Sequence, residues 1–307
     1  MKKILIIKFL IFVSILILLD NILYTFINKI YEKSSYNQVC IIKKIKPDIL
    51  FLGTSRSQHA IIPNIIEKYT GLNGYNLAWD NAGLIWSKGI LSVLTKWYSP
   101  KIIVVEIMPE FNGKEPVSRL GPYFFIEEVK ELLDYYPISK RYKYSIFKTS
   151  RYESKLASLL KRLFIKYEHQ FYGYIPKYNK MGINMQLSSS KAKNSVDNKI
   201  GTAELKKDTV SLIKNIVNTA KSSSSDIIFV QIPTFKNIHL RSEQIYKKIS
   251  ILNEIVFLGS FGFDERTLAL SREDFFDATH MNHSGAKKFS KYLANQILLH
   301  ENFKKRH

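Results

Sequence analysis

Two short segments at opposite ends of the chain carry residue types suited to nucleophilic catalysis. The first, Leu52-Gly53-Thr54-Ser55-Arg56-Ser57, follows an apolar run and places a serine just beyond it. The second contains Asp277-Ala278-Thr279-His280. An aspartate three residues before a histidine in one loop can orient the imidazole and stabilise its protonated form while the ring faces a serine. The pair could therefore activate a serine that the fold brings close to it.

Each segment also has a purely structural interpretation. A serine on a tight strand-to-helix turn exposes its hydroxyl where backbone N–H groups can stabilise an oxyanion. Gly-Thr-Ser is equally a common loop and a good helix N-cap. Asp277 and His280 could also be a structural pair within their loop. At the level of residue types, both alternatives stay open.

The elements around these segments predict a parallel α/β sheet. Short apolar runs at 49–53, 75–78, 101–108 and 226–233 are typical of buried strands. Amphipathic helices are expected at 85–97, 203–220 and 284–299. Strands that alternate with helices imply three layers, α/β/α, with ligands at the carboxyl ends of the strands. Three residues fall at those ends: Ser55, Pro109 and Pro233.

The stretch from 113 to 201 differs from the alternating pattern around it. It is rich in tyrosine, phenylalanine and lysine, and we expect a helical insertion above the sheet. Aromatic and basic side chains suit stacking on carbohydrate, an anionic polymer or the membrane surface. A solvated helical cap with its own aromatic core fits the same composition.

Residues 1–30 are predicted to form a membrane anchor. Lys2, Lys3 and Lys8 precede an unbroken apolar run from Phe9 to Leu19, and a second run follows Asp20. The whole stretch is about as long as a helix crossing a ~30 Å hydrocarbon core. Asp20 would cost a few kcal/mol there unless it is paired or lies near head groups. A cleaved signal and a cytosolic core helix are the alternatives, although no small-x-small cleavage site follows the run.

The composition limits the classes of partner. The chain has 307 residues, 46% hydrophobic and 23% charged, so disorder, collagen and coiled coil are excluded as the main architecture. Lys+Arg (46) minus Asp+Glu (26) gives a net charge of +20. This favours anionic partners, or else reflects a lysine-rich solvated surface. The single cysteine, Cys40, excludes an intramolecular disulfide and a cysteine-based metal cage, and no cofactor or metal is expected.

Together these segments resemble the SGNH (GDSL-like) hydrolase superfamily, in particular its membrane-anchored, cell-envelope branch. That branch includes the D-alanyl-transfer protein of teichoic acid synthesis and polysaccharide O-acetyltransferases. The resemblance covers roughly 45–112 and 203–300. It rests on four motifs besides the anchor: Gly53-Thr54-Ser55-Arg56-Ser57, Tyr75-Asn76-Leu77-Ala78, Gly173-Tyr174-Ile175-Pro176 and Asp277-x-x-His280-x-Asn282-x-x-Gly285.

The resemblance implies an SGNH-like, flavodoxin-like α/β/α domain over 31–307 and a Ser–His–Asp triad. Ser55 would be the nucleophile, His280 the general base and Asp277 its orienting carboxylate. The backbone N–H of Ser55 would supply half of an oxyanion hole. Arg56 would either bind a substrate anion or form an ion pair.

The remaining oxyanion positions of the family fall on less typical residues. Asn81 lies nearest the place of the family's glycine, with Gly83 two residues on. Glu110 occupies the place of the family's asparagine, and Asn112 is displaced from it. A carboxylate there would repel an oxyanion, and losing one donor costs about 10²–10³ in rate.

The activity that the resemblance implies is acyl transfer to, or ester hydrolysis on, a cell-envelope glycan or teichoic-type anionic polymer. The expected location is the bacterial cytoplasmic membrane, with one span and the catalytic domain outside. A multi-pass membrane acyltransferase would supply the acyl group. A plain esterase or deacetylase and a non-catalytic glycan-binding scaffold are the alternatives, and nucleic acid is not an expected partner.

Overall fold

The computed structural model of the chain describes residues 2–34, 37–107, 117–132, 138–153, 156–157, 159, 172–182, 207–235, 255–258 and 268–304. The chain divides into two compact units. Unit 1 comprises Met1–Ile45, Gly89–Trp97 and Pro116–Glu168, and unit 2 comprises Lys46–Lys88, Tyr98–Glu115 and His169–His307. Both segments with catalytic residue types belong to unit 2.

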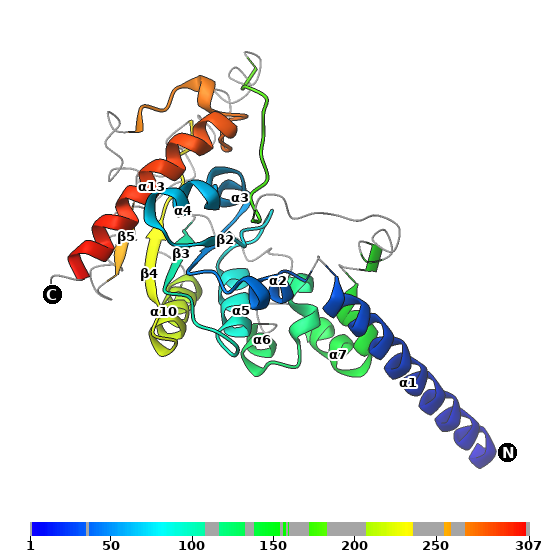
Figure 1. Cartoon of the computed structure of the whole chain (residues 1–307). Helices are drawn as coiled ribbons and strands as arrows, with labels where there is room; N and C mark the ends of the chain where they lie inside the picture. Colours follow the sequence, from blue (N-terminus) through cyan, green and yellow to red (C-terminus); the bar gives the residue numbers. More distant parts are fainter. Residues whose placement is uncertain are drawn as a thin grey trace. The chain divides into compact units, whose positions relative to one another are not determined.

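Unit 2 is built on a five-stranded parallel sheet (Figure 1). Its strands are β1 (Ile49–Leu52), β2 (Gly74–Asn76), β3 (Ile102–Glu106), β4 (Asp226–Val230) and β5 (Val256–Leu258). They lie in the order β2-β1-β3-β4-β5, and every neighbouring pair is parallel. This is the flavodoxin-like order, so the predicted parallel α/β fold is confirmed.

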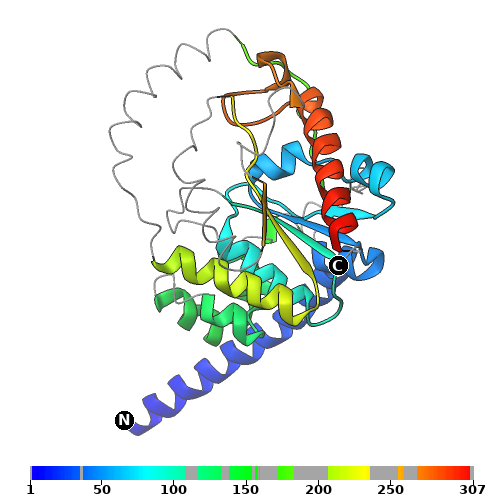
Figure 2. The ribbon, with the colours of Figure 1, turned by 90° about the vertical axis from the view of Figure 1, so that its left-hand side faces the viewer.

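Helices cover the sheet on two sides (Figures 1 and 2). On one side lie α3 (Ser55–Ala60), α4 (Pro63–Thr70) and the long C-terminal helix α13 (His283–Lys304), while α10 (Lys207–Ser222) packs against β4. Alternate strand residues such as Phe51, Val104 and Ile228 share one buried cluster with Phe289 and Leu293 of α13. Because strand side chains alternate between faces, the residues between them serve the other layer.

Unit 1 consists of helices. It contains α1 (Lys2–Lys33), α2 (Gln38–Ile45), η1 (Val117–Tyr123), α6 (Glu127–Leu132), α7 (Ile138–Ile146) and η3 (Lys148–Tyr152). The remaining elements are α5 (Leu84–Leu94), which crosses the boundary between units, and η5 (Arg272–Asp274) in unit 2. Within the predicted insertion at 113–201, the described residues 117–132 and 138–153 contain helices, whereas 172–182 contain none.

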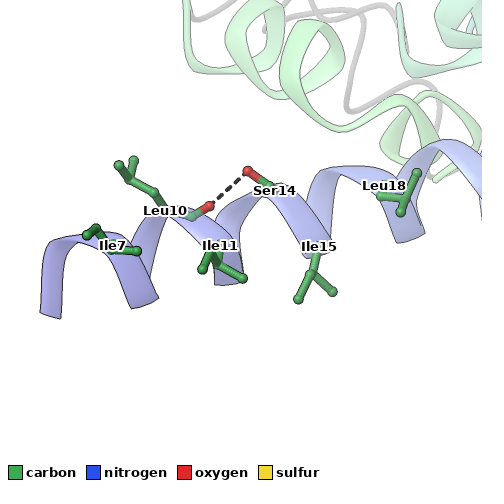
Figure 3. A pocket seen from close by; sticks show the side chains of 6 residues that line it. All are labelled: Ile7, Leu10, Ile11, Ser14, Ile15 and Leu18. Atoms are coloured by element: carbon green, nitrogen blue, oxygen red, sulfur yellow. Dashed lines mark hydrogen bonds between the residues drawn. The ribbon is translucent and has the colours of Figure 1, made fainter. Parts of the chain in front are cut away.

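Helix α1 is long and apolar enough to cross a membrane. Its N-terminal part is exposed and offers a shallow apolar hollow lined by Ile7, Leu10, Ile11, Ser14, Ile15 and Leu18 (Figure 3). The Ser14 hydroxyl donates to the Leu10 carbonyl at 2.9 Å, so this helix face presents no unpaired side-chain donor to its surroundings. A span needs that internal satisfaction, because hydrocarbon offers no partner.

Candidate active site

The structure brings Ser55, His280 and Asp277 together in one chain of hydrogen bonds. The Ser55 Oγ lies 2.8 Å from Nε2 of His280. On the other side of the ring, Nδ1 lies 2.8 Å from Oδ2 of Asp277. A carboxylate can only accept, so Nδ1 carries the proton and Nε2 is left to accept the serine O–H. This is the tautomer that a general base needs.

Ser55 owes its position to the end of β1. After Leu52 the chain passes through Gly53, and Thr54 caps α3 by accepting the Arg56 N–H at 3.2 Å. Ser55 is therefore the first residue of the helix. The N–H groups of a first helical turn have no intrahelical acceptor, which leaves the Ser55 N–H available to a developing oxyanion.

A buried carboxylate beneath this turn fixes its shape. Glu106 ends β3 and is 3% exposed. Its Oε2 accepts the Thr54 N–H at 2.8 Å and hydroxyl at 2.9 Å, and the Ser57 N–H at 3.3 Å. Its partners make it a positioning residue for the Ser55 turn.

Residue 53 must be glycine because Glu106 lies too close to it for a side chain to fit. A Cβ on Gly53 would lie 2.6 Å from Glu106 Cβ and Oε2, and 2.9 Å from the Ser57 Oγ. The register places Leu52 opposite Val105, so the two strands end level with each other and their next residues meet at the carboxyl edge. A larger residue at 53 would push the serine turn away from its support.

The loop that carries Asp277 and His280 is fixed at its base. Asp274 is buried and accepts a hydrogen bond from the Lys288 ammonium group of α13 at 2.8 Å. A Cβ on Gly285 would lie 2.2 Å from the Asp274 carbonyl oxygen, so the first turn of α13 can approach this loop only with glycine. The histidine is thereby held by the helix that follows it.

Local hydrogen bonds keep Asp277 ionised. Burial raises the pKa of its carboxyl, but hydrogen bonds from the His280 ring and the Thr279 N–H, with smaller contributions from the His280 charge and N–H, outweigh burial and hold the pKa well below its ordinary value. The Thr279 N–H lies at 2.8 Å and the His280 N–H at 2.9 Å. The carboxylate can therefore stabilise an imidazolium.

A second histidine, His59, lies beside the triad. Its ring meets the His280 ring edge-on, with centroids 5.6 Å apart. Its Nδ1–H donates to the Ile175 carbonyl at 2.7 Å. Burial lowers the pKa of His59, assisted by the nearby Lys177, so the ring is neutral at neutral pH. Sequence reasoning missed this residue, although its spacing of four from Ser55 on α3 was a usable signal.

The segment 172–182 braces the site from outside the sheet. Gly173 has a φ of 87°, and a Cβ there would lie 1.9 Å from the Asn76 carbonyl oxygen. The neighbouring Tyr174 hydroxyl lies 2.9 Å from Nδ1 of His283, at the start of α13. This close approach places the Ile175 carbonyl within hydrogen-bonding distance of His59.

The residues expected at the oxyanion hole lie between β2 and α5. Asn81 is exposed and has a φ of 54°. Gly83 is partly buried, and its carbonyl accepts the Ser87 N–H of α5. Glu110 and Asn112 lie outside the described residues. Arg56 is partly buried directly after Ser55.

Asn76 has a supporting role that the sequence motif did not reveal. Its side-chain N–H groups donate to the carbonyls of Ser57 and Ile61, each at 2.9 Å. Its Oδ1 accepts the Ala78 N–H at 3.1 Å. The asparagine at the end of β2 therefore holds the middle and the C-terminal end of α3, the helix that begins at Ser55.

Comparison with known proteins finds similarity in structure but not in sequence. The sequence matches no protein-family model and no curated protein. Among solved structures, the chain is similar to a provisionally assigned acylhydrolase of Bacteroides fragilis, at 10% identity and a TM-score of 0.38. That likeness covers 81% of this chain and 87% of the other. So distant a likeness leaves the chemistry of the site to its own side chains.

Proposed function

We propose that the chain is a membrane-anchored, serine-dependent enzyme that transfers an acyl group or hydrolyses an ester. The observation that carries the proposal is the hydrogen-bonded chain from Ser55 through His280 to Asp277. The SGNH-like order of the strands and the positions of the serine and Asp-x-x-His segments on it agree with this assignment.

The reaction would proceed through an acyl-enzyme. Ser55 Oγ attacks the ester carbonyl while its proton passes to His280 Nε2, and the C–O bond to the leaving group then breaks as the imidazolium returns the proton to it. In the second half, His280 takes a proton from water or a sugar hydroxyl, whose oxygen attacks the acyl carbon. The Ser55–acyl bond breaks, and the proton returns to Ser55.

The proposed substrate is an anionic or glycan polymer of the bacterial cell envelope. A net charge of +20 favours an anionic polymer over a small neutral ester. The long apolar helix α1 suggests anchorage in the cytoplasmic membrane, with the catalytic unit outside and a multi-pass membrane partner as the donor of the acyl group. We expect acetyl-type groups, by analogy with the resembling branch.

Residues 20–31 of α1 favour a retained anchor over a cleaved signal. The side chains of Asp20, Ile27 and Tyr31 are buried against the other helices of unit 1. The Asp20 carboxylate accepts the Lys148 N–H at 2.7 Å and the Thr149 hydroxyl, which is the pairing that an acidic residue at this depth requires. Cleavage after the apolar run would remove part of this packing.

The test is turnover of p-nitrophenyl acetate by the full chain in detergent, with and without a polysaccharide acceptor. We expect Ser55→Ala to abolish turnover, while Ser211→Ala, an exposed serine of α10, keeps it. Acetyl appearing on the acceptor identifies a transferase, and acetate alone a hydrolase. Equal rates for the parent and Ser55→Ala would leave a glycan-binding scaffold as the function.

A further inference from the structure

Helix α1 presents two different faces over its C-terminal half. The face formed by positions 20, 24, 27, 28 and 31 packs against the other helices of unit 1. The Asp20 carboxylate accepts a hydrogen bond from η3, and the Tyr31 hydroxyl lies 3.0 Å from the Tyr123 hydroxyl of η1. The opposite face is apolar and exposed at Ile22, Leu23 and Phe26. One side of the helix is therefore already covered by protein where the other side is still suited to lipid.

The length of the apolar run places the start of this stretch at the edge of the hydrocarbon. Exposed apolar side chains begin at Ile4, and from Ile4 to Leu19 the helix spans about 24 Å at 1.5 Å per residue, close to a ~30 Å core. Lys8, inside this run, can extend its ammonium group to the near interface. The hydrocarbon therefore ends near Asp20, where Asp20 and Asn21 mark the interface.

The other helices of unit 1 meet α1 at that level. Their contact begins at Asp20. The residues that make the contact are Lys148 and Thr149 of η3, and Lys148 also donates from Nζ to the Asn21 side chain at 2.7 Å. A protein segment bonded to α1 at this depth must lie within the lipid–water interface.

We propose that the corner formed by Tyr142, Ile146 and Phe147, where α7 runs into η3, inserts into the interfacial layer of the membrane beside α1. These three side chains are 61%, 53% and 44% exposed, and Phe147 immediately precedes the residues that hold Asp20. Exposed aromatic and aliphatic side chains beside a membrane span are suited to the interfacial layer. The occupant of this corner is thus lipid, which would hold unit 1 against the bilayer surface.

The inference rests on the proposed anchorage of α1, so its test reports on both. In the full chain carrying Cys40→Ser, single cysteines replace Phe147 or Ile146 and are labelled with an environment-sensitive fluorophore. The protein is reconstituted alone into phosphatidylglycerol-containing vesicles with doxyl-labelled lipids, the doxyl group being shallow in one sample, to report on 146 and 147, and deep in another, to report on 16. Leu16→Cys, within the proposed span of α1, is the reference for a position in lipid, and Lys291→Cys, exposed on α13, is the reference for a position in water.

We expect blue-shifted emission and quenching by about half at 146 and 147, strong quenching at 16 and none at 291. Quenching at 16 with emission at both 146 and 147 like that at 291 would overturn the inference and leave the anchor intact. No quenching at 16 would overturn the anchorage itself. Turnover of p-nitrophenyl acetate by the same variants separates either failure from a failure of the triad.

Discussion

The Ser55 hydroxyl and the His280 ring come from positions 225 residues apart, yet they lie 2.8 Å from each other. The hydrogen bond depends on supports that neither residue supplies itself. Glu106 and Asn76 hold the serine turn, and the hydrogen bonds within the loop hold Asp277. At the residue scale, the account therefore predicts losses of activity from residues that never touch the substrate as well as from those that do.

Asp277→Asn should reduce the rate at which Ser55 reacts by about 10²–10⁴-fold. An amide at this position carries no negative charge. It therefore neither fixes the proton on Nδ1 of His280 nor stabilises the imidazolium that forms during the reaction. The rate of p-nitrophenyl acetate turnover measures the effect. Asp226→Asn, which alters an aspartate 3.6 Å from His300 and outside the triad, should leave the rate unchanged.

The same variant has a defined pH signature in stability. Because the folded-state pKa of Asp277 lies below its unfolded value, the charged carboxylate stabilises the fold above that unfolded value, about 3.9, and this contribution is lost as the pH falls toward the folded pKa. The difference in unfolding free energy between the parent and Asp277→Asn should shrink below about pH 4. An equal difference at pH 7 and pH 3 would contradict the assigned role.

His59 is predicted to position His280 through its edge-on ring. His59→Leu removes both the ring and the hydrogen bond to Ile175, and we expect kcat to fall by up to about 10²-fold with KM little changed. His59→Asn can still donate to the Ile175 carbonyl and should recover much of that loss. Equal activity for the parent and His59→Leu would show that the ring is only a packing residue.

The sequence allowed the types of the triad residues to be predicted, but not their supports. Ser55 lies at the end of an apolar strand, and Asp277 and His280 are neighbours in a single loop, so local spacing reveals them. Glu106 and Asn76 act through contacts with α3 and the turn before it, which no local pattern encodes. Asn81 and Gly83 were inferred by position in a motif, and their role at an oxyanion hole stays a prediction.

At the scale of elements, the serine turn depends on the meeting of β1 and β3. Both strands end at one level, and the turn after β1 closes over Glu106 with no room for a side chain at residue 53. The geometry of the nucleophile is thus set by strand register and by one glycine.

Gly53→Ala should lower the unfolding free energy by about 1–3 kcal/mol, because the added methyl group overlaps Glu106. It should also slow the reaction of Ser55. Gly182→Ala is the matched control, since nothing lies within 4 Å of a Cβ there. Chemical denaturation followed by tryptophan fluorescence gives the free energies, and similar values for the two variants would contradict the tight contact.

The described strands β1 to β4 could be predicted, whereas β5 could not. Runs 49–53, 75–78, 101–108 and 226–233 correspond to β1, β2, β3 and β4 because buried parallel strands are continuously hydrophobic. The strand β5 spans only Val256–Leu258 and pairs through its backbone with β4, which a three-residue run does not reveal. Pro233 lacks an N–H, and β4 ends before it at Val230.

At the scale of the whole molecule, the chain combines a unit that carries the proposed triad, a helical unit that includes an apolar helix, and a net charge of +20. In the proposed function, this charge acts at long range to concentrate an anionic polymer near the protein. Because such attraction between exposed charges is screened within about 8 Å at physiological salt, it must weaken as salt rises.

Binding of a poly(glycerol phosphate) chain to the full protein should therefore weaken steeply between 50 mM and 500 mM NaCl. A neutral glucan of similar length should bind with little dependence on salt. Light-scattering or calorimetric titration in detergent gives both affinities. Equal salt dependence for the two polymers would contradict the proposed role of the charge.

The central claim is that Ser55 is an activated nucleophile, and labelling by a fluorophosphonate tests it most directly. The full chain in detergent should be labelled at Ser55, and the Ser55→Ala and His280→Ala variants should not, while Ser211→Ala is labelled like the parent. Mass spectrometry of the labelled peptide identifies the residue. A folded parent that remains unlabelled, or labelling that survives in Ser55→Ala, would contradict the account.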